Sequence, residues 1–198
     1  KKLKVRSTEV LYQTGVNMTA QAYSGKMLVA SPSLDNDEIF SKAVVYIYQQ
    51  KEDLVLGLVL NKPSKLKISD VYKLKNGDPG MPMPDNVYKG GPVNDQSIIL
   101  LHENNWNSTS SANVGRGLAV SSDELMLEKI LTGNRPKHFR MFCGCSTWHP
   151  RQLAMECHSG SWMLIDDPKE HLFFNHEGKQ QWLKGIEVAG TEVMNDYF

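Results

Sequence analysis

The residues best suited to chemistry lie in one stretch of 16 positions that holds Cys143, Cys145, His149, Cys157 and His158. Thiolate and imidazole groups are the ligands that zinc prefers, and structural zinc sites usually place roughly two to four residues between paired cysteines. Here a single residue separates Cys143 from Cys145. If residues 152–157 are helical, Cys157 lies about one helix length from Cys145. We therefore expect neither a metal nor a cofactor in this stretch.

The same stretch permits a second chemistry, in which Cys145 is a nucleophile and His149 its base. A cysteine beside the start of a helix can have a lowered pKa, and an adjacent histidine can accept its proton. A third residue that would orient the histidine is not evident from the pattern. Small buried cysteines near the end of a strand are the commoner explanation. A cysteine-dependent hydrolase or redox-active protein therefore stays as an alternative hypothesis.

Two further motifs are weaker. Gly90-Gly91-Pro92 lacks the spacing of a phosphate-binding loop, and the proline removes a backbone donor, so a tight turn is the better interpretation. His102 ends an apolar run beside Glu103, where a histidine is more often a hydrogen-bonded structural residue than a catalytic base.

The overall composition limits the class of protein. The 198 residues carry 22 Lys+Arg and 22 Asp+Glu, so the formal net charge is zero and direct nucleic-acid binding is disfavoured. Three clustered cysteines suggest reduced thiols and a cytoplasmic location. Apolar runs such as residues 54–60 are far shorter than the roughly 20 residues that cross a bilayer, so no membrane association is expected. The patterning predicts a polar extension over residues 1–24 and a single domain over residues 25–198.

The hydrophobic pattern predicts several strands, at residues 26–30, 43–48, 54–60, 97–102, 117–120, 139–143 and 162–165. The runs at 43–48 and 54–60 are separated by a short polar turn. They are therefore expected to pair as an antiparallel hairpin at the centre of a sheet.

Short helices are expected between these strands, and the first lies around residues 68–74. Ser121 and Glu124 are spaced as a capping box for a second helix that ends at Gly133, and Pro150 is placed to begin a third. A last helix is predicted over about 179–189, ending at Gly190, whereas the proline-rich residues 78–84 should be irregular. Strands without regular βαβ alternation indicate an α+β fold.

Several of these segments, taken in order, resemble the AlgH/YqgE family of bacterial proteins. The resemblance runs from about residue 25 to residue 190, which is nearly the whole chain except the extension. Its carriers are residues 25–32, 43–47, 57–63, 90–93, 101–102 and 152–153, together with Phe40, Gly144, Trp148, Glu156, Trp162 and Trp182.

The resemblance implies a strongly curved, mixed but mainly antiparallel, split-barrel-like sheet flanked by short helices. It also implies a cytoplasmic protein without an established enzymatic activity, from a family labelled as transcriptional regulators. Family-motif positions on loops and strand ends are candidates for a shared binding surface. In this sequence they are Asn61, Gly90, Gly91, Pro92, His102, Trp148, Gln152 and Glu156.

The chain departs from the family pattern in two places and resembles a divergent member. Relatives often carry Cys-Glu-His where this chain has Tyr48-Gln49-Gln50, and Gly-Tyr-x-x-Trp where it has Gly144-Cys145-Ser146-Thr147-Trp148. The leading hypothesis is a non-enzymatic regulatory or adaptor protein that binds a partner protein or a small ligand at this loop-built surface. The alternative is the enzyme or redox protein that uses Cys145 and His149.

Overall fold

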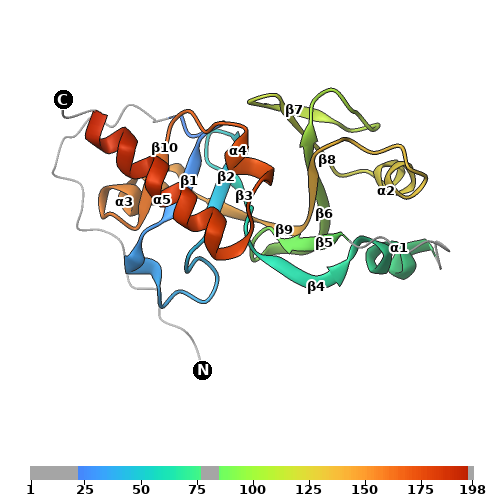
Figure 1. The fold of residues 1–198 in the computed structure, drawn as a ribbon, viewed down its shortest axis with the longest axis horizontal. Helices are drawn as coiled ribbons and strands as arrows, with labels where there is room; N and C mark the ends of the chain where they lie inside the picture. The colour runs from blue at the N-terminus through green and yellow to red at the C-terminus, as the bar shows by residue number, and fades with distance from the viewer. Residues whose placement is uncertain (1–21, 77–84, 196–198) are drawn as a thin grey trace.

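The computed structural model describes residues 22–76 and 85–195. Figure 1 shows an elongated molecule in which strands β10, β1, β2 and β3 form one end with helices α3, α4 and α5. Strands β4 to β8 form the other end with α1 and α2, and the long strand β9 belongs to both ends. The fold therefore consists of two sheet halves that share one strand.

The strands are β1 Met27–Ala30, β2 Val44–Gln50, β3 Val55–Val59, β4 Pro63–Lys67, β5 Asn86–Lys89, β6 Val93–Glu103, β7 Ala112–Gly115, β8 Leu118–Ser121, β9 Phe139–Trp148 and β10 Trp162–Ile165. The helices are a 3-10 turn at Pro32–Leu34, α1 Ile68–Asn76, α2 Glu124–Leu131, α3 Pro150–His158, α4 His171–Phe174 and α5 Gly178–Asn195.

The main path of the sheet runs in the order β10-β1-β2-β3-β9-β6-β8-β7, and every pairing along it is antiparallel. β5 lies off this path and pairs with β9 in parallel, which makes the sheet mixed. The sheet is strongly curved. A hydrogen bond shows this, since the hydroxyl of Tyr46 on β2 donates to the carbonyl of Val114 on β7 at 2.6 Å. In a flat sheet these strands, five places apart, would be separated by about 24 Å. The predicted fold is confirmed.

Glycines allow β9 to pass close to the segment that connects β5 to β6. The N–H of Gly90 donates to Cys143 and its carbonyl accepts from Val59, each at 2.9 Å, so this residue joins β9 to β3. A Cβ on Gly90 would lie 2.3 Å from the carbonyl oxygen of Gly144. The motif predicted to be a turn is therefore also a close crossing of two backbones.

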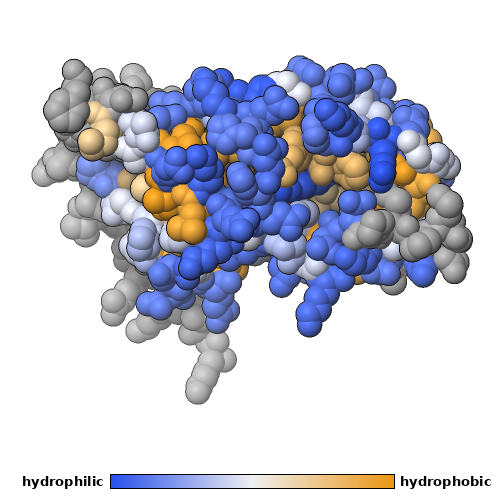
Figure 2. Space-filling view, viewed as in Figure 1, coloured by the Kyte–Doolittle hydropathy of each residue, from blue (hydrophilic) through white to orange (hydrophobic). Residues whose placement is uncertain are grey.

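Three buried clusters stabilise the two faces of the sheet. Side chains alternate along a strand, so neighbouring residues of β2 belong to different clusters. Tyr46 lies in the cluster on the concave face of the sheet, together with residues of α4 and α5, and we call this the concave cluster. Val45 and Ile47 lie in a second cluster on the opposite face, beneath α3. A third cluster packs Ile68 of α1 and Ile130 of α2 against the other half of the sheet. Figure 2 shows that hydrophilic residues cover most of the outer face in that view.

The predicted hairpin is confirmed, since β2 pairs with β3 and lies inside the sheet. Two predicted helix ends are wrong. Ser121 belongs to β8, and α2 is instead capped by Asp123, whose side chain accepts from the N–H of Met126. Gly190 does not end the last helix, which continues to Asn195. A glycine inside a helix lowers stability by about 1 kcal/mol relative to alanine, and the packing of α5 offsets this cost at Gly190.

Four elements were not predicted, namely β4, β5, β7 and α4. The irregular segment predicted at residues 78–84, and residues 1–21 of the predicted extension, lie outside the described residues. Tyr23, assigned to that extension, is 1% exposed and packs in the cluster beneath α3. Within residues 22–76 and 85–195, no helix has both the length and the apolar character needed to cross a membrane.

Candidate functional site

Asn61 and His102, both predicted to lie at a binding surface, are buried and hold the fold together. Asn61 accepts from the N–H of Val44 at 2.9 Å and donates to the carbonyls of Lys42 and Gly178, so it joins β2 to the start of α5. His102 is fully buried, and its ring nitrogens are hydrogen-bonded to Ser121 and to a backbone carbonyl. Neither side chain is available to a ligand in this conformation.

Three predicted residues do come together. Trp148 ends β9, and its indole N–H donates to Glu156 of α3 at 3.1 Å, while Gln152 donates to the other carboxylate oxygen at 2.8 Å. Trp162 of β10 also donates to Glu156, at 2.8 Å. Since this carboxylate already accepts three side-chain donors and both indoles are buried, the cluster chiefly anchors α3 onto the sheet. Only Gln152 presents an exposed side chain.

The structure does not assemble Cys145 and His149 as a nucleophile and its base. His149 is the N-cap of α3, where its Nδ1 accepts from Arg151, and its Nε2 lies 3.9 Å from Asp53. Cys145 belongs to the concave cluster, whereas Trp148, just before His149, belongs to the opposite one. Burial raises the pKa of the Cys145 thiol, although a hydrogen bond from Tyr48 opposes this effect. An activated thiol would need the opposite shift.

One cavity in the described part of the chain lies between the end of β2 and the edge strand β7. It has a volume of about 600 Å³. Its polar lining consists mainly of uncharged side chains, including Ser24, Gln49 and Asn113, while Tyr48 and Val120 supply apolar surface. Such a mixture suits a ligand that needs both apolar contact and hydrogen bonds.

A second cavity of about 460 Å³ lies between the first half of β6 and the start of α2. It is lined by Ile98, Ile99 and Cys145, by uncharged polar side chains such as Gln96, and by the carboxylates of Asp123 and Glu124. Tyr48 lines both cavities and therefore lies between them. We call the two cavities together the Tyr48 groove.

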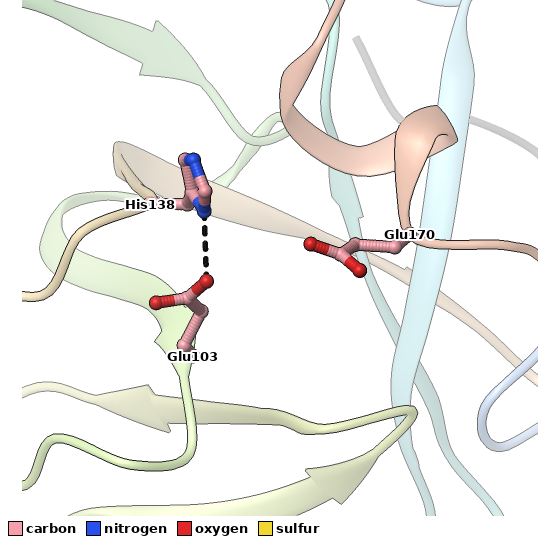
Figure 3. Close-up of side chains that lie close together, drawn as sticks. All are labelled: Glu103, His138 and Glu170. Carbon is pink, nitrogen blue, oxygen red and sulfur yellow. Dashed lines mark hydrogen bonds and ion pairs between the residues drawn. The ribbon is translucent and has the colours of Figure 1, made fainter.

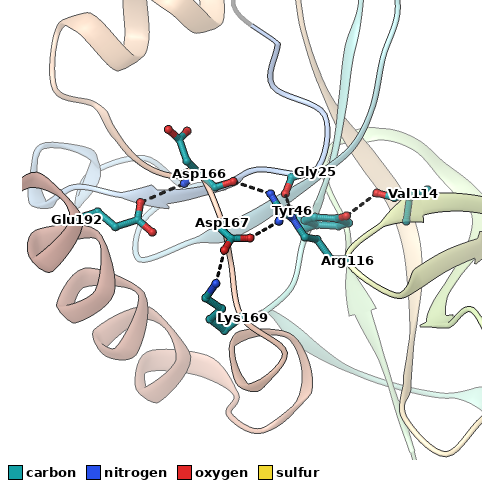
Figure 4. A network of polar contacts seen from close by, with 8 residues as sticks. All are labelled: Gly25, Tyr46, Val114, Arg116, Asp166, Asp167, Lys169 and Glu192. Carbon is teal, nitrogen blue, oxygen red and sulfur yellow. Dashed lines mark hydrogen bonds and ion pairs between the residues drawn. The ribbon is translucent and has the colours of Figure 1, made fainter. Parts of the chain in front are cut away.

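Arg116 and Gly25, which line the first cavity, belong to a polar network that Figure 4 shows. Arg116, in the turn between β7 and β8, forms an ion pair with Asp167 and donates to the carbonyls of Asp166 and Gly25. Lys169 pairs with the same Asp167 carboxylate. Hydrogen bonds from Lys169, together with the charge of Arg116, hold the pKa of Asp167 below its usual value. The network therefore fixes the turn against both β1 and the connection from β10 to α4.

Two of the three charged side chains that line the groove, Arg116 and Asp123, are engaged by the protein itself, and the third is Glu124. Arg116 is paired as described, and Asp123 accepts from Ser108, Ser110 and Met126. Burial alone would raise the pKa of Asp123, but these hydrogen bonds outweigh it and lower the pKa. Burial and the neighbouring Cys145 raise the pKa of Tyr48, so its hydroxyl stays protonated and able to donate.

Sequence reasoning missed most of the residues of this groove. They come from strands that are far apart in the sequence, and edge strand β7 was not predicted. The sequence held one signal for this groove, namely the two departures from the family pattern, which include Tyr48 and Cys145. These two residues contact each other in the structure.

The fold defines a class of α+β proteins with a curled, mainly antiparallel sheet and short helices. Residues 27–194 match the AlgH-like family, and the chain belongs to that family. A "UPF0301 protein" from Francisella tularensis subsp. novicida is 31% identical over 184 residues, covering 88% of this chain and 93% of the relative.

Two solved structures share the fold. The AlgH protein from Pseudomonas aeruginosa matches with a TM-score of 0.71 and 24% identity, covering 85% of this chain and 89% of that one. Protein DIP2367 from Corynebacterium diphtheriae matches with a TM-score of 0.65 and 24% identity, covering 83% and 86%. These identities carry the fold and do not by themselves carry a function.

Proposed function

We propose that this protein is a cytoplasmic regulatory or adaptor protein that binds a partner protein or a small ligand without transforming it. The observation that carries the proposal is the Tyr48 groove, whose two cavities of about 600 and 460 Å³ share one tyrosine. Their lining offers uncharged donors and acceptors beside apolar surface, the composition typical of ligand sites. The family label of transcriptional regulator agrees with such a role, exerted through a partner, since the formal net charge is zero.

The alternative function, an enzyme or redox protein that uses Cys145, remains testable beside the first. Its support is that Cys145 is one of the residues that line the second cavity. Against it stand the raised pKa of the thiol and the capping role of His149.

The test blocks the groove without touching the buried core. Ala112 and Ser97 are exposed and line the two cavities, so Ala112→Arg and Ser97→Arg should each fill one with a long charged side chain. Gln180→Arg, on the exposed side of α5, is the matched control. The readout is the transcript profile of a strain that lacks the protein and is complemented with each variant.

We expect the control to restore the wild-type profile and at least one groove variant to fail, although all fold normally by circular dichroism. Restoration by both groove variants would overturn the proposal. Failure of Cys145→Ser alone, with both groove variants active, would favour the thiol-dependent alternative.

A further inference from the structure

Three metal-binding side chains from distant parts of the sequence converge outside the Tyr48 groove. Glu103 ends β6, His138 precedes β9 and Glu170 precedes α4. Each offers a ligand atom, and these atoms all lie within 4.8 Å of one another. Figure 3 shows the carboxylates of Glu103 and Glu170 and the ring of His138 arranged around a common space.

A buried oxygen atom without a partner among the described residues is a second observation that points to a cation site. Oε1 of Glu103 is hydrogen-bonded to Nδ1 of His138 at 2.7 Å. Oε2 of the same carboxylate is buried and has no hydrogen-bond partner among the described residues, although the whole side chain is 22% exposed. Because a buried carboxylate oxygen without a partner is costly and rare in folded proteins, a cation at this position would satisfy it.

The surroundings favour a divalent ion over a proton alone. A metal ion binds carboxylates in their ionised form and imidazole in its neutral form, so this ligand set brings a charge of about −2 to a bound ion and suits a divalent one. The ring of His138 stacks on Phe174 of α4, with centroids 6.1 Å apart and planes 19° apart, so its orientation is restrained. Mixed imidazole and carboxylate ligands suit zinc and neighbouring transition metals more than magnesium or calcium.

We propose that Glu103, His138 and Glu170 form a binding site for a divalent transition metal, with zinc as its probe. In a tetrahedral zinc site with bonds of about 2 Å, ligand atoms lie about 3.3 Å apart. The exposed side chain of Glu170 then has to move by about 1.5 Å or less, while His138 and Glu103 separate slightly as the ion replaces the hydrogen between them. A water completes the site, and the ion links the end of β6, the start of β9 and the approach to α4.

The test uses the full chain, freed of metal by a chelator and titrated with zinc by calorimetry. We expect one site per chain, at least about tenfold weaker in both Glu170→Gln and His138→Gln. Glu128→Gln, an exposed carboxylate on α2, is the control and should bind as the wild type does. Glu170 is exposed, so its variant should fold normally, which circular dichroism verifies.

Cobalt substitution separates this site from one built on the cysteines. A site of nitrogen and oxygen ligands gives visible d–d bands, whereas thiolate ligation adds an intense near-ultraviolet charge-transfer band. Visible bands that disappear in Glu170→Gln would support the proposal. A thiolate band, equal zinc affinity in the wild type and both ligand variants, or no zinc binding by the wild type would overturn it.

Discussion

The close crossing at Gly90 allows a substitution whose cost can be worked out from distances. In Gly90→Ala the new Cβ would lie 2.3 Å from the carbonyl oxygen of Gly144 and 3.1 Å from a methyl carbon of Leu58. The obstacle at 2.3 Å is backbone, so the two segments must separate by about 1 Å to reach ordinary contact. That movement would stretch the 2.9 Å hydrogen bonds that Gly90 makes to Cys143 and Val59 beyond the normal range.

The expected loss combines two terms. Overpacking costs about 1–3 kcal/mol, and two weakened hydrogen bonds add about 1 kcal/mol each. The free energy of unfolding should therefore fall by about 3–5 kcal/mol. In a chain of this length each kcal/mol lowers the melting temperature by about 2–4 °C, so a fall of at least about 6 °C is expected in calorimetry.

Two other glycines are matched controls. Gly190 lies in α5 with open space around it, so Gly190→Ala should stabilise the protein by about 0.5–1 kcal/mol. Gly117 also has open space but a φ of +72°, so Gly117→Ala should cost only the backbone strain, about 1–2 kcal/mol. If Gly90→Ala is no more destabilising than Gly117→Ala, the crossing is compliant and the steric reasoning is wrong.

Three further predictions follow from the buried polar groups. Burial and the charge of Glu156 raise the pKa of Cys157 to about 11, so about a thousandth of this thiol is ionised at pH 8; mass spectrometry should show very slow iodoacetamide alkylation, and rapid labelling would contradict this. Burial lowers the pKa of His102 in the folded protein, so the unfolded chain takes up a proton on this residue at a higher pH than the folded protein does. The contribution of neutral His102 to stability is therefore complete above about pH 6.5 and is lost as the pH falls toward the folded pKa. The loss is at most about 1.4 kcal/mol per pH unit. Urea unfolding at several pH values should show a shallower acid slope for His102→Gln, and identical slopes would count against it. Glu156→Gln replaces two charge-assisted bonds from Trp148 and Trp162 with neutral ones and should lower the free energy of unfolding by about 1–2 kcal/mol, whereas unchanged stability would show that these bonds contribute nothing net.

The strands with dense apolar patterns could be predicted from the sequence because they are buried on both faces. β2 and β3, with Val45 and Val59 paired between them, are such strands. β4 and β7 were missed because their residues, such as Lys65 and Asn113, are polar and exposed. Those strands form because neighbouring strands offer hydrogen bonds, which no local pattern records.

Helix ends show the same division. Pro150 at the start of α3 was predicted correctly, because proline suits the first turn whatever surrounds it. Ser121 was taken for a cap on spacing alone, but its hydroxyl is hydrogen-bonded to the buried His102 and to Ser111. Asp123 then accepts from the first turn of α2. The choice between two suitable capping residues depended on contacts outside the helix.

The sequence by itself determined the α+β class, the central hairpin, the absence of a global charge for nucleic-acid binding and the resemblance to the AlgH/YqgE family. These properties depend on local composition, alternation and ordered motifs. Tertiary structure alone decided that Asn61 and His102 are buried, that Tyr48 contacts Cys145, and that Glu103 meets Glu170. The reason is the curl of the sheet, which brings strands five places apart into hydrogen-bonding contact through Tyr46 and Val114 and so places side chains together that no sequence spacing relates.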